Sequence, residues 1–258
     1  MQNPLISIVV PSFNKVKYIG QTLESIVNQN YQNLEVIIQD GGSTDGTLAV
    51  IKKFARKYPG IFNFESKKDK GQLDAINTGL KKATGEILTY INADDTYGLG
   101  ALDSVAKAYM ENPSSLWFAG RGRVINSKGK EIAKFIIWYK NLLLSLNSRL
   151  FLLAVNYLMQ PSVFITRKAW EKFGSFIGTQ SYITEYDLWL RLSRVSMPRV
   201  ISECISSFRI SGENISSVSY VRLLDDDYII AKKYTKNMLI LALHKLNNLA
   251  RIAVVRHI

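Results

Sequence analysis

The first hundred residues alternate between short apolar runs and amphipathic segments, and this alternation limits the fold more than any other feature of the chain. The apolar runs are rich in β-branched residues, begin 26 to 29 residues apart, and lie at Leu5–Val10, Leu34–Ile38, Ile61–Phe64 and Ile87–Ile91. Each interval has room for a loop and one crossover helix, and its apolar residues recur at helical spacing, as at Ile19, Leu23 and Ile26. Apolar strands separated by helices predict an α/β fold with a mostly parallel sheet that helices cover on both faces.

After residue 96 the alternation fades. The pattern there predicts a helix at Leu99–Met110, strands at Leu116–Ile125 and Glu131–Ile137, a helical stretch up to Met159, and a short helix at Tyr186–Ser193. From about Leu223 the chain reads as helix to its end. We find no internal repeat and no Pro/Gly-rich linker, so we expect one domain over residues 1–215 and a C-terminal helical extension over residues 216–258.

The cysteine and histidine content excludes several kinds of site. The chain has one cysteine, Cys204, and its two histidines, His244 and His257, lie in the last fifteen residues. This composition argues against a disulfide framework, a cysteine-based zinc site and catalysis by a Ser-His-Asp or Cys-His set. A bound metal would therefore need carboxylate oxygens as ligands.

The net charge of the chain is strongly positive. Lysine and arginine number 33 against 21 acidic residues, a balance of +12. Such an excess suits nucleic acid, an anionic membrane surface or phosphorylated substrates, and it also serves solubility alone. The N-terminus has no basic n-region or small-residue cleavage site, and no stretch reaches about 18 apolar residues, so we expect a cytoplasmic or peripheral protein.

Polar residues follow three of the predicted strands. These segments are Pro11–Asn14, Asp40–Thr47 and Asn92–Asp95. In an open α/β sheet the carboxyl ends of parallel strands form the ligand crevice, so these side chains are expected to converge there. Acidic groups in such a crevice indicate either a metal with phosphate or the recognition of a base and a sugar.

Three acidic groups are candidates on chemical grounds, each with a plain structural alternative. Asp94 and Asp95 are adjacent carboxylates that a hard divalent cation would stabilise, or they form an exposed acidic turn. Asp40 can accept a hydrogen bond from a base imide, or it belongs to a tight turn before a helix. Glu185 and Asp187 open a helix, as a general base or because acids favour that end of the helix dipole.

In combination these segments resemble the family 2 glycosyltransferases. The resemblance covers residues 5 to about 212 and rests on ISIVVPSFN, DGGSTDGT, DKGQLDAINTGLKKATGEILTYINADD, MQPSVFITRKAWEKFGSF and EYDLWLRL, in that order. It implies a GT-A fold with a Rossmann-like sheet, a nucleotide-binding half at 1–97 and an acceptor-binding half at 98–215. It further implies a nucleotide-diphospho-sugar donor, a divalent metal (Mn²⁺ or Mg²⁺) and inversion at the anomeric carbon.

The resemblance also assigns the residues of the donor site. It places Pro11, Ser12, Asn14, Lys70 and Gly71 against the nucleotide, with Asp40 and Asp69 on the base. Asn92-Ala93-Asp94 resembles the Asp-x-Asp motif of the family, with an amide in the place of the first acid. Asp94 would then hold the metal, and Asp95 would support the metal or position the sugar.

On the acceptor side, the resemblance makes Glu185 the catalytic base, with Asp187 as the alternative, and places Gln160-Pro161 along the acceptor site. Ser211 stands where many members carry a histidine near the metal, so water would complete the coordination or Arg209 would stabilise the leaving phosphates.

We therefore predict an inverting glycosyltransferase that moves a sugar, from a UDP-sugar in the first instance, to a hydroxyl of a glycan or lipid-linked acceptor in bacterial surface polysaccharide synthesis. The alternative is a catalytically inactive relative that acts as a membrane-docked assembly partner. A nucleic-acid-binding role is disfavoured because acids gather at the strand ends. A sugar-nucleotide pyrophosphorylase would need a basic, Gly-rich loop after the first strand.

The C-terminal extension has an apolar stripe that includes Leu239, Leu243 and Leu246. This stripe suits an interfacial helix on an anionic membrane, a helix packed on the domain, or a contact in a homodimer. A membrane contact would place the protein at the inner face of the cell membrane.

Overall fold

The sheet is built around a strand that is buried along its whole length. The computed structural model describes residues 3–177, 185–212 and 220–255. Its central strand β1 (Ile6–Ser12) is buried at every position, as expected for an apolar strand covered on both faces. The strand order is β3-β2-β1-β4-β8-β6-β9-β5, and β7 pairs with β6. The other strands are β2 (Leu34–Asp40), β3 (Phe62–Ser66), β4 (Ile87–Tyr90), β5 (Thr96–Tyr97), β6 (Trp117–Asn126), β7 (Glu131–Ile132), β8 (Val163–Thr166) and β9 (Arg199–Ile210).

Most of these strands run parallel to one another. β1 pairs in parallel with β2 on one side and with β4 on the other, so the chain order reverses between β1 and β4. β8 is antiparallel to both β4 and β6, and it thereby joins the two predicted halves of the domain in one sheet. The switch between β1 and β4 is where an open α/β sheet leaves a crevice for a ligand.

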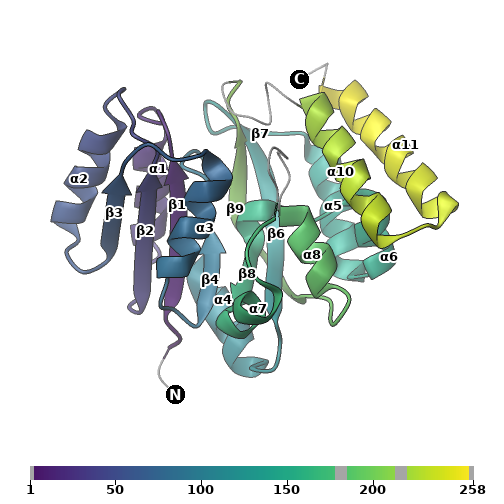
Figure 1. Ribbon diagram of the computed structural model, residues 1–258, viewed down its shortest axis with the longest axis horizontal. Helices are drawn as coiled ribbons and strands as arrows, with labels where there is room; N and C mark the ends of the chain where they lie inside the picture. The colour runs from purple at the N-terminus through teal and green to yellow at the C-terminus, as the bar shows by residue number, and fades with distance from the viewer. Residues whose placement is uncertain (1–2, 178–184, 213–219, 256–258) are drawn as a thin grey trace.

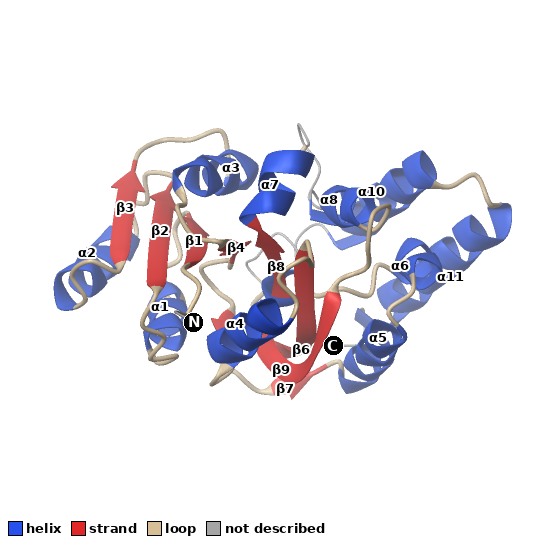
Figure 2. Ribbon diagram, turned by 90° about the horizontal axis from the view of Figure 1, so that it is seen from below, coloured by secondary structure: helices blue, strands red, loops and turns tan. Residues whose placement is uncertain are grey.

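Helices cover both faces of the sheet (Figures 1 and 2). Along the chain they are α1 (Ile19–Val27), α2 (Thr47–Lys57), α3 (Gln72–Lys82), α4 (Ala101–Glu111), α5 (Lys134–Leu146), α6 (Arg149–Val155), α7 (Arg167–Phe173), α8 (Glu185–Leu192), α10 (Tyr220–Tyr234) and α11 (Met238–Val255). Alternate residues of β1 point to opposite faces, so the sheet separates two apolar cores. Helices α1, α2 and α4 close one core, and α3, α6, α8, α10 and α11 close the other.

The structure confirms the predicted α/β fold and most of its elements. One predicted strand, at 131–137, is wrong: it is two residues long, and α5 begins at Lys134. Ala133 interrupts the strand because its φ is +54°, a left-handed conformation that an extended strand does not contain. Strands β8 and β9 were not predicted. β8 is a buried run of four residues with little periodicity of its own, and β9, although twelve residues long, is largely exposed in its first half and largely buried in its second, so it has no regular alternation.

Over its described residues, 220–255, the C-terminal extension forms two helices. α10 and α11 are separated by the turn at residues 235–237, where the Asn237 side chain accepts hydrogen bonds from the backbone of Leu239 and Ile240. The pair lies beside α5 and α6 at one end of the molecule (Figures 1 and 2). Within the described ranges, no helix combines the length and apolar character needed to span a membrane.

Candidate active site

The loops at the carboxyl ends of β1 and β2 are tied together by side-chain hydrogen bonds. The backbone N–H of Asn14 donates to Ser43 Oγ over 2.8 Å, and Asn14 Oδ1 accepts from the backbone of Thr44 over 3.0 Å. Asn14 adopts a left-handed φ of +50°, which Asn tolerates better than most residues. Pro11 and Ser12 are buried at the end of β1 directly beneath this loop. The predicted donor residues of the first two loops therefore lie together.

Asp40 is held inside its own loop. Its carboxylate is 2% exposed and accepts hydrogen bonds from the backbone N–H groups of Gly42 and Ser43 and from the hydroxyls of Ser43 and Ser66, at 2.5 to 3.2 Å. Three of these donors share Oδ2, and Oδ1, with one donor, is buried, so the loop would have to move before a base N–H could reach the carboxylate. The geometry therefore makes Asp40 an anchor of the loop that carries Ser43.

Asp69 lies at the surface of the same edge, against Gly41. A Cβ atom on Gly41 would be 3.0 Å from Asp69 Oδ2, so the carboxylate fills the space that a side chain at position 41 would take. Asp69 Oδ1 accepts from the backbone N–H of Gly71, whose φ of +106° favours glycine. The loop thus presents Asp69 and Lys70 beside the predicted nucleotide site.

The third loop, after β4, contains a pair of buried carboxylates. Asp95 is fully buried and accepts from the backbone N–H of Arg209 (2.7 Å) and the amide of Asn92 (3.3 Å). Burial, and then the neighbouring Asp94 charge, raise the pKa of Asp95 well above its usual value. Asp94 is paired with Lys15, whose Nζ lies 2.7 Å from its Oδ2. Ala93, between Asn92 and this pair, is buried in the core.

Arg209 supports this loop from below. Its guanidinium group is 2% exposed and donates to the backbone oxygen of Asp94 (2.7 Å), the side chain of Gln21 (2.9 Å) and the backbone oxygen of Asn126 (3.2 Å). The same group lies 4.9 Å from the centre of the Tyr18 ring. These contacts direct the positive charge of Arg209 to the backbone of the Asp94–Asp95 turn.

The oxygen atoms of this turn fit one hard divalent cation only in part. Asp94 offers a carboxylate at the crevice, and the raised pKa of Asp95 shows that added positive charge would stabilise the pair. Both oxygens of Asp95 already accept hydrogen bonds, and Lys15 would have to leave Asp94. Among the described residues, no group of three or more acidic, histidine or cysteine side chains could enclose a metal. The fit is therefore to a cation held by Asp94 and by oxygens of a bound substrate.

Apart from these loops, a pocket beside β4 contains Glu185. Glu185, Gln160 and Tyr90 line it together with apolar side chains. Gln160 donates to the backbone oxygen of Tyr90 over 2.8 Å, and the ring of Phe176 packs edge-on against Tyr90 at 5.4 Å. Burial, together with the Glu185 carboxylate that the Tyr90 hydroxyl contacts, raises the pKa of Tyr90. The structure thus brings the predicted base and the predicted acceptor segment into one pocket.

Asp187, the alternative base, is engaged elsewhere. Its Oδ1 accepts from the hydroxyl of Tyr234 (2.7 Å), and its Oδ2 pairs with Nε of Arg191 (2.9 Å). Asp187 therefore joins α8 to α10. Thr184, which precedes Glu185 in the sequence motif, lies outside the described residues.

Three residues near the site escaped the sequence analysis. Lys15 pairs with Asp94, Gln72 donates to the Asn92 side chain over 2.5 Å, and Tyr90 contacts Glu185. Lys15 and Gln72 stand within or beside quoted motifs, so their position in the sequence was a usable signal. Tyr90 stands in a quoted motif as well, two residues before Asn92, but the sequence does not show that its hydroxyl meets Glu185.

Comparisons with known proteins place the chain among glycosyltransferases. The family described as "Glycosyl transferase family 2" matches residues 7–173. A chondroitin synthase of Escherichia coli is 30% identical over 83% of this chain, and a hyaluronan synthase of Pasteurella multocida is 27% identical over 83% of it. The chain spans only 30% and 21% of the length of these two relatives.

Two solved structures share the fold. The mannosyltransferase PcManGT of Pyrobaculum calidifontis, in complex with GDP-Man and Mn²⁺, is 19% identical with a TM-score of 0.71, over 100% of this chain and 74% of its own. TarS of S. aureus (residues 1–349), in complex with UDP-GlcNAc, is 20% identical with a TM-score of 0.67, over 89% and 66% of the two chains. At this level of identity the likeness shows the GT-A fold.

Proposed function

Because the chain belongs to the family 2 glycosyltransferases, we propose that it transfers a sugar, with inversion, from a UDP-sugar to a hydroxyl group of a glycan or lipid-linked acceptor. The observation that carries this proposal is the arrangement around β4. Its carboxyl end holds the Asp94–Asp95 turn of the donor side, and its Tyr90 contacts Glu185 in the adjacent pocket. Donor and acceptor groups would thus meet across one strand.

On the donor side, Asp69 is the better candidate for reading the base. Its carboxylate lies at the surface beside Gly41, whereas Asp40 is buried and bonded to its own loop. A carboxylate there accepts from the imide N–H of uracil, and thymine and guanine present the same group. TarS was solved with UDP-GlcNAc and PcManGT with GDP-Man, which supports a nucleotide-sugar donor without choosing between these bases.

A divalent cation, Mn²⁺ or Mg²⁺, would be held by Asp94 and would neutralise the diphosphate as it departs. The chain itself contributes the buried positive charge of Arg209 beneath the turn and the charge of Lys15 beside it. Lys15 can turn from Asp94 to a phosphate oxygen, because its side chain reaches the crevice from the loop after β1.

On the acceptor side, Glu185 would take the proton of the attacking hydroxyl as its oxygen bonds to the anomeric carbon. Tyr90 fixes the Glu185 carboxylate from the sheet, and Gln160 has a buried Oε1 with no hydrogen-bond partner within the described residues. That oxygen would accept from a second acceptor hydroxyl. The apolar walls of the pocket limit competing attack by water.

The biological setting is proposed on the relatives and the charge. The relatives include chondroitin and hyaluronan synthases, which supports a role in surface polysaccharide synthesis. With a net charge of +12, we place the protein in the cytoplasm at the inner face of the cell membrane, where a lipid-linked acceptor would be reached.

The donor is tested by thermal unfolding with UDP, dTDP, GDP and ADP, each with and without Mn²⁺. A nucleotide at a hundred times its dissociation constant adds about 2.7 kcal/mol of stability, so a bound nucleotide raises the melting temperature visibly. We expect the largest Mn²⁺-dependent shift with UDP. Asp69→Asn should weaken that shift, and Asp40→Asn should instead lower the melting temperature without ligand.

Glu185→Gln tests the base. Transfer should fall at least about 100-fold, the contribution of general base catalysis, while UDP binding stays unchanged. Retained transfer with weakened UDP binding would remove Glu185 from this role. Absence of nucleotide binding and of transfer in the folded wild-type protein would favour the inactive assembly partner instead.

A further inference from the structure

Helix α11 turns His244 and Asn248 inward and most of its leucines outward, although Leu241 packs in the core. His244 and Asn248 are buried against the neighbouring helices, whereas Leu239 is 69% and Leu246 is 64% exposed. An ordinary surface helix has the opposite arrangement, with its apolar stripe on the core. The apolar stripe read from the sequence therefore does not pack on the domain.

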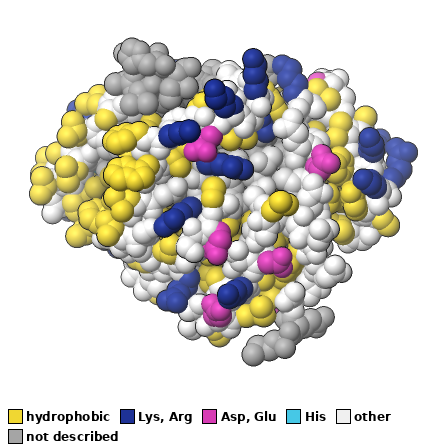
Figure 3. Space-filling model, turned by 180° about the vertical axis from the view of Figure 1, so that it is seen from behind, with side chains coloured by type: hydrophobic (Ala, Val, Ile, Leu, Met, Phe, Trp, Pro, Cys, Tyr) yellow, Lys and Arg dark blue, Asp and Glu magenta, His cyan; other side chains and the backbone are white. Residues whose placement is uncertain are grey.

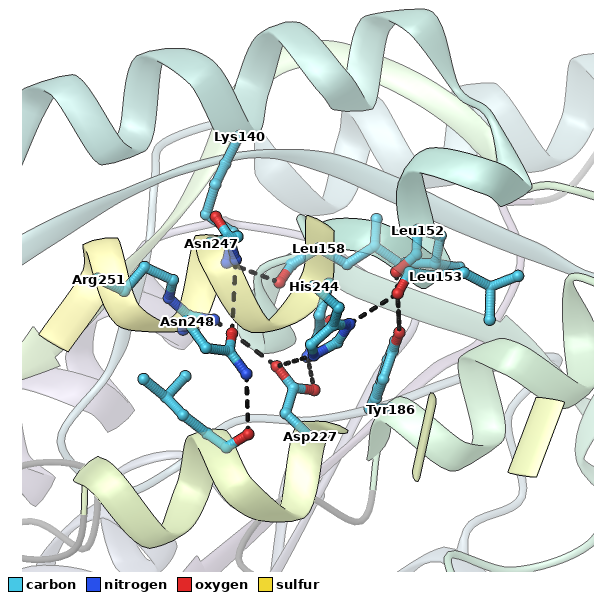
Figure 4. Close-up of polar contacts among 12 residues, drawn as sticks. Lys140, Leu152, Leu153, Leu158, Tyr186, Asp227, His244, Asn247, Asn248 and Arg251 are labelled. Carbon is cyan, nitrogen blue, oxygen red and sulfur yellow. Dashed lines mark hydrogen bonds and ion pairs between the residues drawn. The ribbon is translucent and has the colours of Figure 1, made fainter. Parts of the chain in front are cut away.

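The inward polar groups contact the neighbouring helices (Figure 4). His244 Nδ1 lies 2.7 Å from the backbone oxygen of Leu153 in α6, and the Asn248 side chain donates to the backbone of Leu224 in α10 over 2.8 Å. Asp227 of α10 is fully buried beside His244 and Arg251. Rotating α11 to bury its outward leucines would break these polar contacts. The outward position of the apolar stripe is therefore a stable feature.

Helix α5 shows the same inversion. Its Lys140 points inward and donates to the backbone oxygen of Leu158, and its Asn141 exchanges hydrogen bonds with the backbone of Gly122. Phe135 and Trp138 are 71% and 61% exposed, with their rings stacked at 5.9 Å. Tyr139 donates to Asn247 over 3.1 Å and so links α5 to α11.

The exposed apolar side chains form one surface. Leu150 and Phe151 of α6 are also exposed, between α5 and α11. Seen from behind, apolar side chains gather on the end of the molecule that these three helices occupy, with several basic side chains and an acidic one beside them (Figure 3). We call this surface, made by the outward sides of α5, α6 and α11, the apolar platform. Contiguous apolar surfaces of this kind mark sites that contact a protein or a membrane.

The charge of the platform selects its partner. Helices α5, α6 and α11 contain no aspartate or glutamate, and their basic residues are Lys134, Lys140, Arg149, Lys245 and Arg251. Lys134 and Lys245 are exposed beside the apolar side chains. Leucine and tryptophan together with lysine, without acids, match an anionic lipid interface. A second copy would bring two positive surfaces together.

We infer that the apolar platform docks the protein on the surface of a bilayer rich in anionic lipid, with Trp138, Leu246 and their neighbours inserted among the headgroups. The inference rests on the membrane location proposed above, and it does not depend on the transfer reaction. It adds α5 and α6 to the C-terminal helix as membrane-contacting elements.

The test measures co-sedimentation of the full chain with vesicles of phosphatidylcholine alone and of phosphatidylcholine with one third phosphatidylglycerol. We expect at least about tenfold stronger binding to the anionic vesicles, weakened by salt, since each basic residue near the surface contributes about 1 kcal/mol, or fivefold. Lys134→Glu with Lys245→Glu should abolish that preference.

Matched single variants then test the apolar contribution. Trp138→Ser and Leu246→Ser should each weaken binding to anionic vesicles about tenfold or more, because each removes a large inserted side chain. The control Leu99→Ser removes a leucine that is 87% exposed before α4, and it should bind like wild type. All variants should keep the wild-type melting temperature and UDP-dependent shift, which separates docking from the donor site.

Two results would overturn the inference. In the first, the wild type binds neutral and anionic vesicles equally well, and Trp138→Ser binds both as well as the wild type does. The other is a dimer in sedimentation equilibrium that Trp138→Ser dissociates, in a protein that does not bind vesicles, since the platform would then contact a second copy.

Discussion

Arg209 has two possible roles at the donor loop: it supports the loop, or it binds the phosphates of the donor. In one of the two alternatives that follow from the family resemblance, the charge of Arg209 stabilises the leaving phosphates. In the structure, the guanidinium group is buried and donates to the Asp94 backbone, Gln21 and the Asn126 backbone. Arg209→Met keeps the length of the apolar stem and removes all of these bonds. It therefore distinguishes a residue that supports the loop, whose loss lowers stability, from one that binds the phosphates, whose loss lowers donor affinity.

The expected loss of stability follows from those contacts. Arg209→Met removes one charged hydrogen bond to the buried backbone oxygen of Asp94 and further ones to the more exposed oxygens of Gln21, Asn126 and Ser127, so we expect a cost of about 3–5 kcal/mol. For a domain of this size, about 2–4 °C per kcal/mol converts that cost to a fall in melting temperature of roughly 6–20 °C. Arg209→Lys should recover only a small part, because one ammonium group cannot reach three separated acceptors.

Urea unfolding without ligand measures the free energy, and titration with UDP and Mn²⁺ measures donor affinity. Arg123→Met is the control, because Arg123 is exposed and donates to Ser207 on the neighbouring strand. We expect its cost to stay within about 1 kcal/mol. The reasoning is refuted if Arg209→Met costs as little as the control while UDP affinity falls tenfold or more, because the guanidinium would then face the phosphates.

Three other predictions concern the base, a buried lysine and a close packing contact. Tyr90→Phe removes a hydroxyl that contacts the proposed base, so kcat should fall about tenfold, the contribution of one such hydrogen bond, while UDP affinity stays unchanged. An equal fall in kcat and in UDP affinity would indicate general distortion of the site. Burial, and then the nearby positive charge of α11, lower the pKa of Lys140 from 10.5 to about 7. Between these two pKa values Lys140 is protonated in the unfolded chain and neutral in the folded one, so the free energy of unfolding should rise from pH 7 toward pH 10. Lys140→Met should remove roughly 1–3 kcal/mol of that rise between pH 7 and 9, and an unchanged slope in urea unfolding would contradict it. Gly79→Ala places a Cβ 2.4 Å from a Val9 methyl group and should lower the free energy of unfolding in urea by about 1–3 kcal/mol. The control Gly20→Ala, whose Cβ would have its nearest neighbour at 3.8 Å, should lower it by nothing. Equal losses would show that β1 and α3 can move apart.

Much of the donor side could be predicted because it depends on local order along the chain. β1, β2 and β4 are uninterrupted apolar runs, and the polar residues that follow them must emerge at one edge of a parallel sheet. The strand expected at 131–137 failed for a local reason as well, since its apolar residues fit a strand or a helix, and Ala133 takes a left-handed conformation.

The individual duties of side chains at that edge could not be predicted. Asp40 and Asp69 both follow strands, and only the fold shows that Ser43 and Ser66 occupy the first while the second lies free of them at the surface. Glu185 and Asp187 are equivalent as acids at a helix start, and only the tertiary contact with Tyr234 commits Asp187 to α10. Each distinction depends on a partner distant in the sequence.

The sequence by itself determined the α/β sheet, the edge that carries the ligand site and the family, because periodicity and motif order are properties of neighbouring residues. The tertiary structure alone decided that Lys15 meets Asp94, that Tyr90 meets Glu185 and that α11 faces outward with its leucines. An amphipathic helix has two sides, and its sequence does not state which one the protein covers. For α11 the buried partners of His244 and Asn248 make that choice, and they lie on other helices.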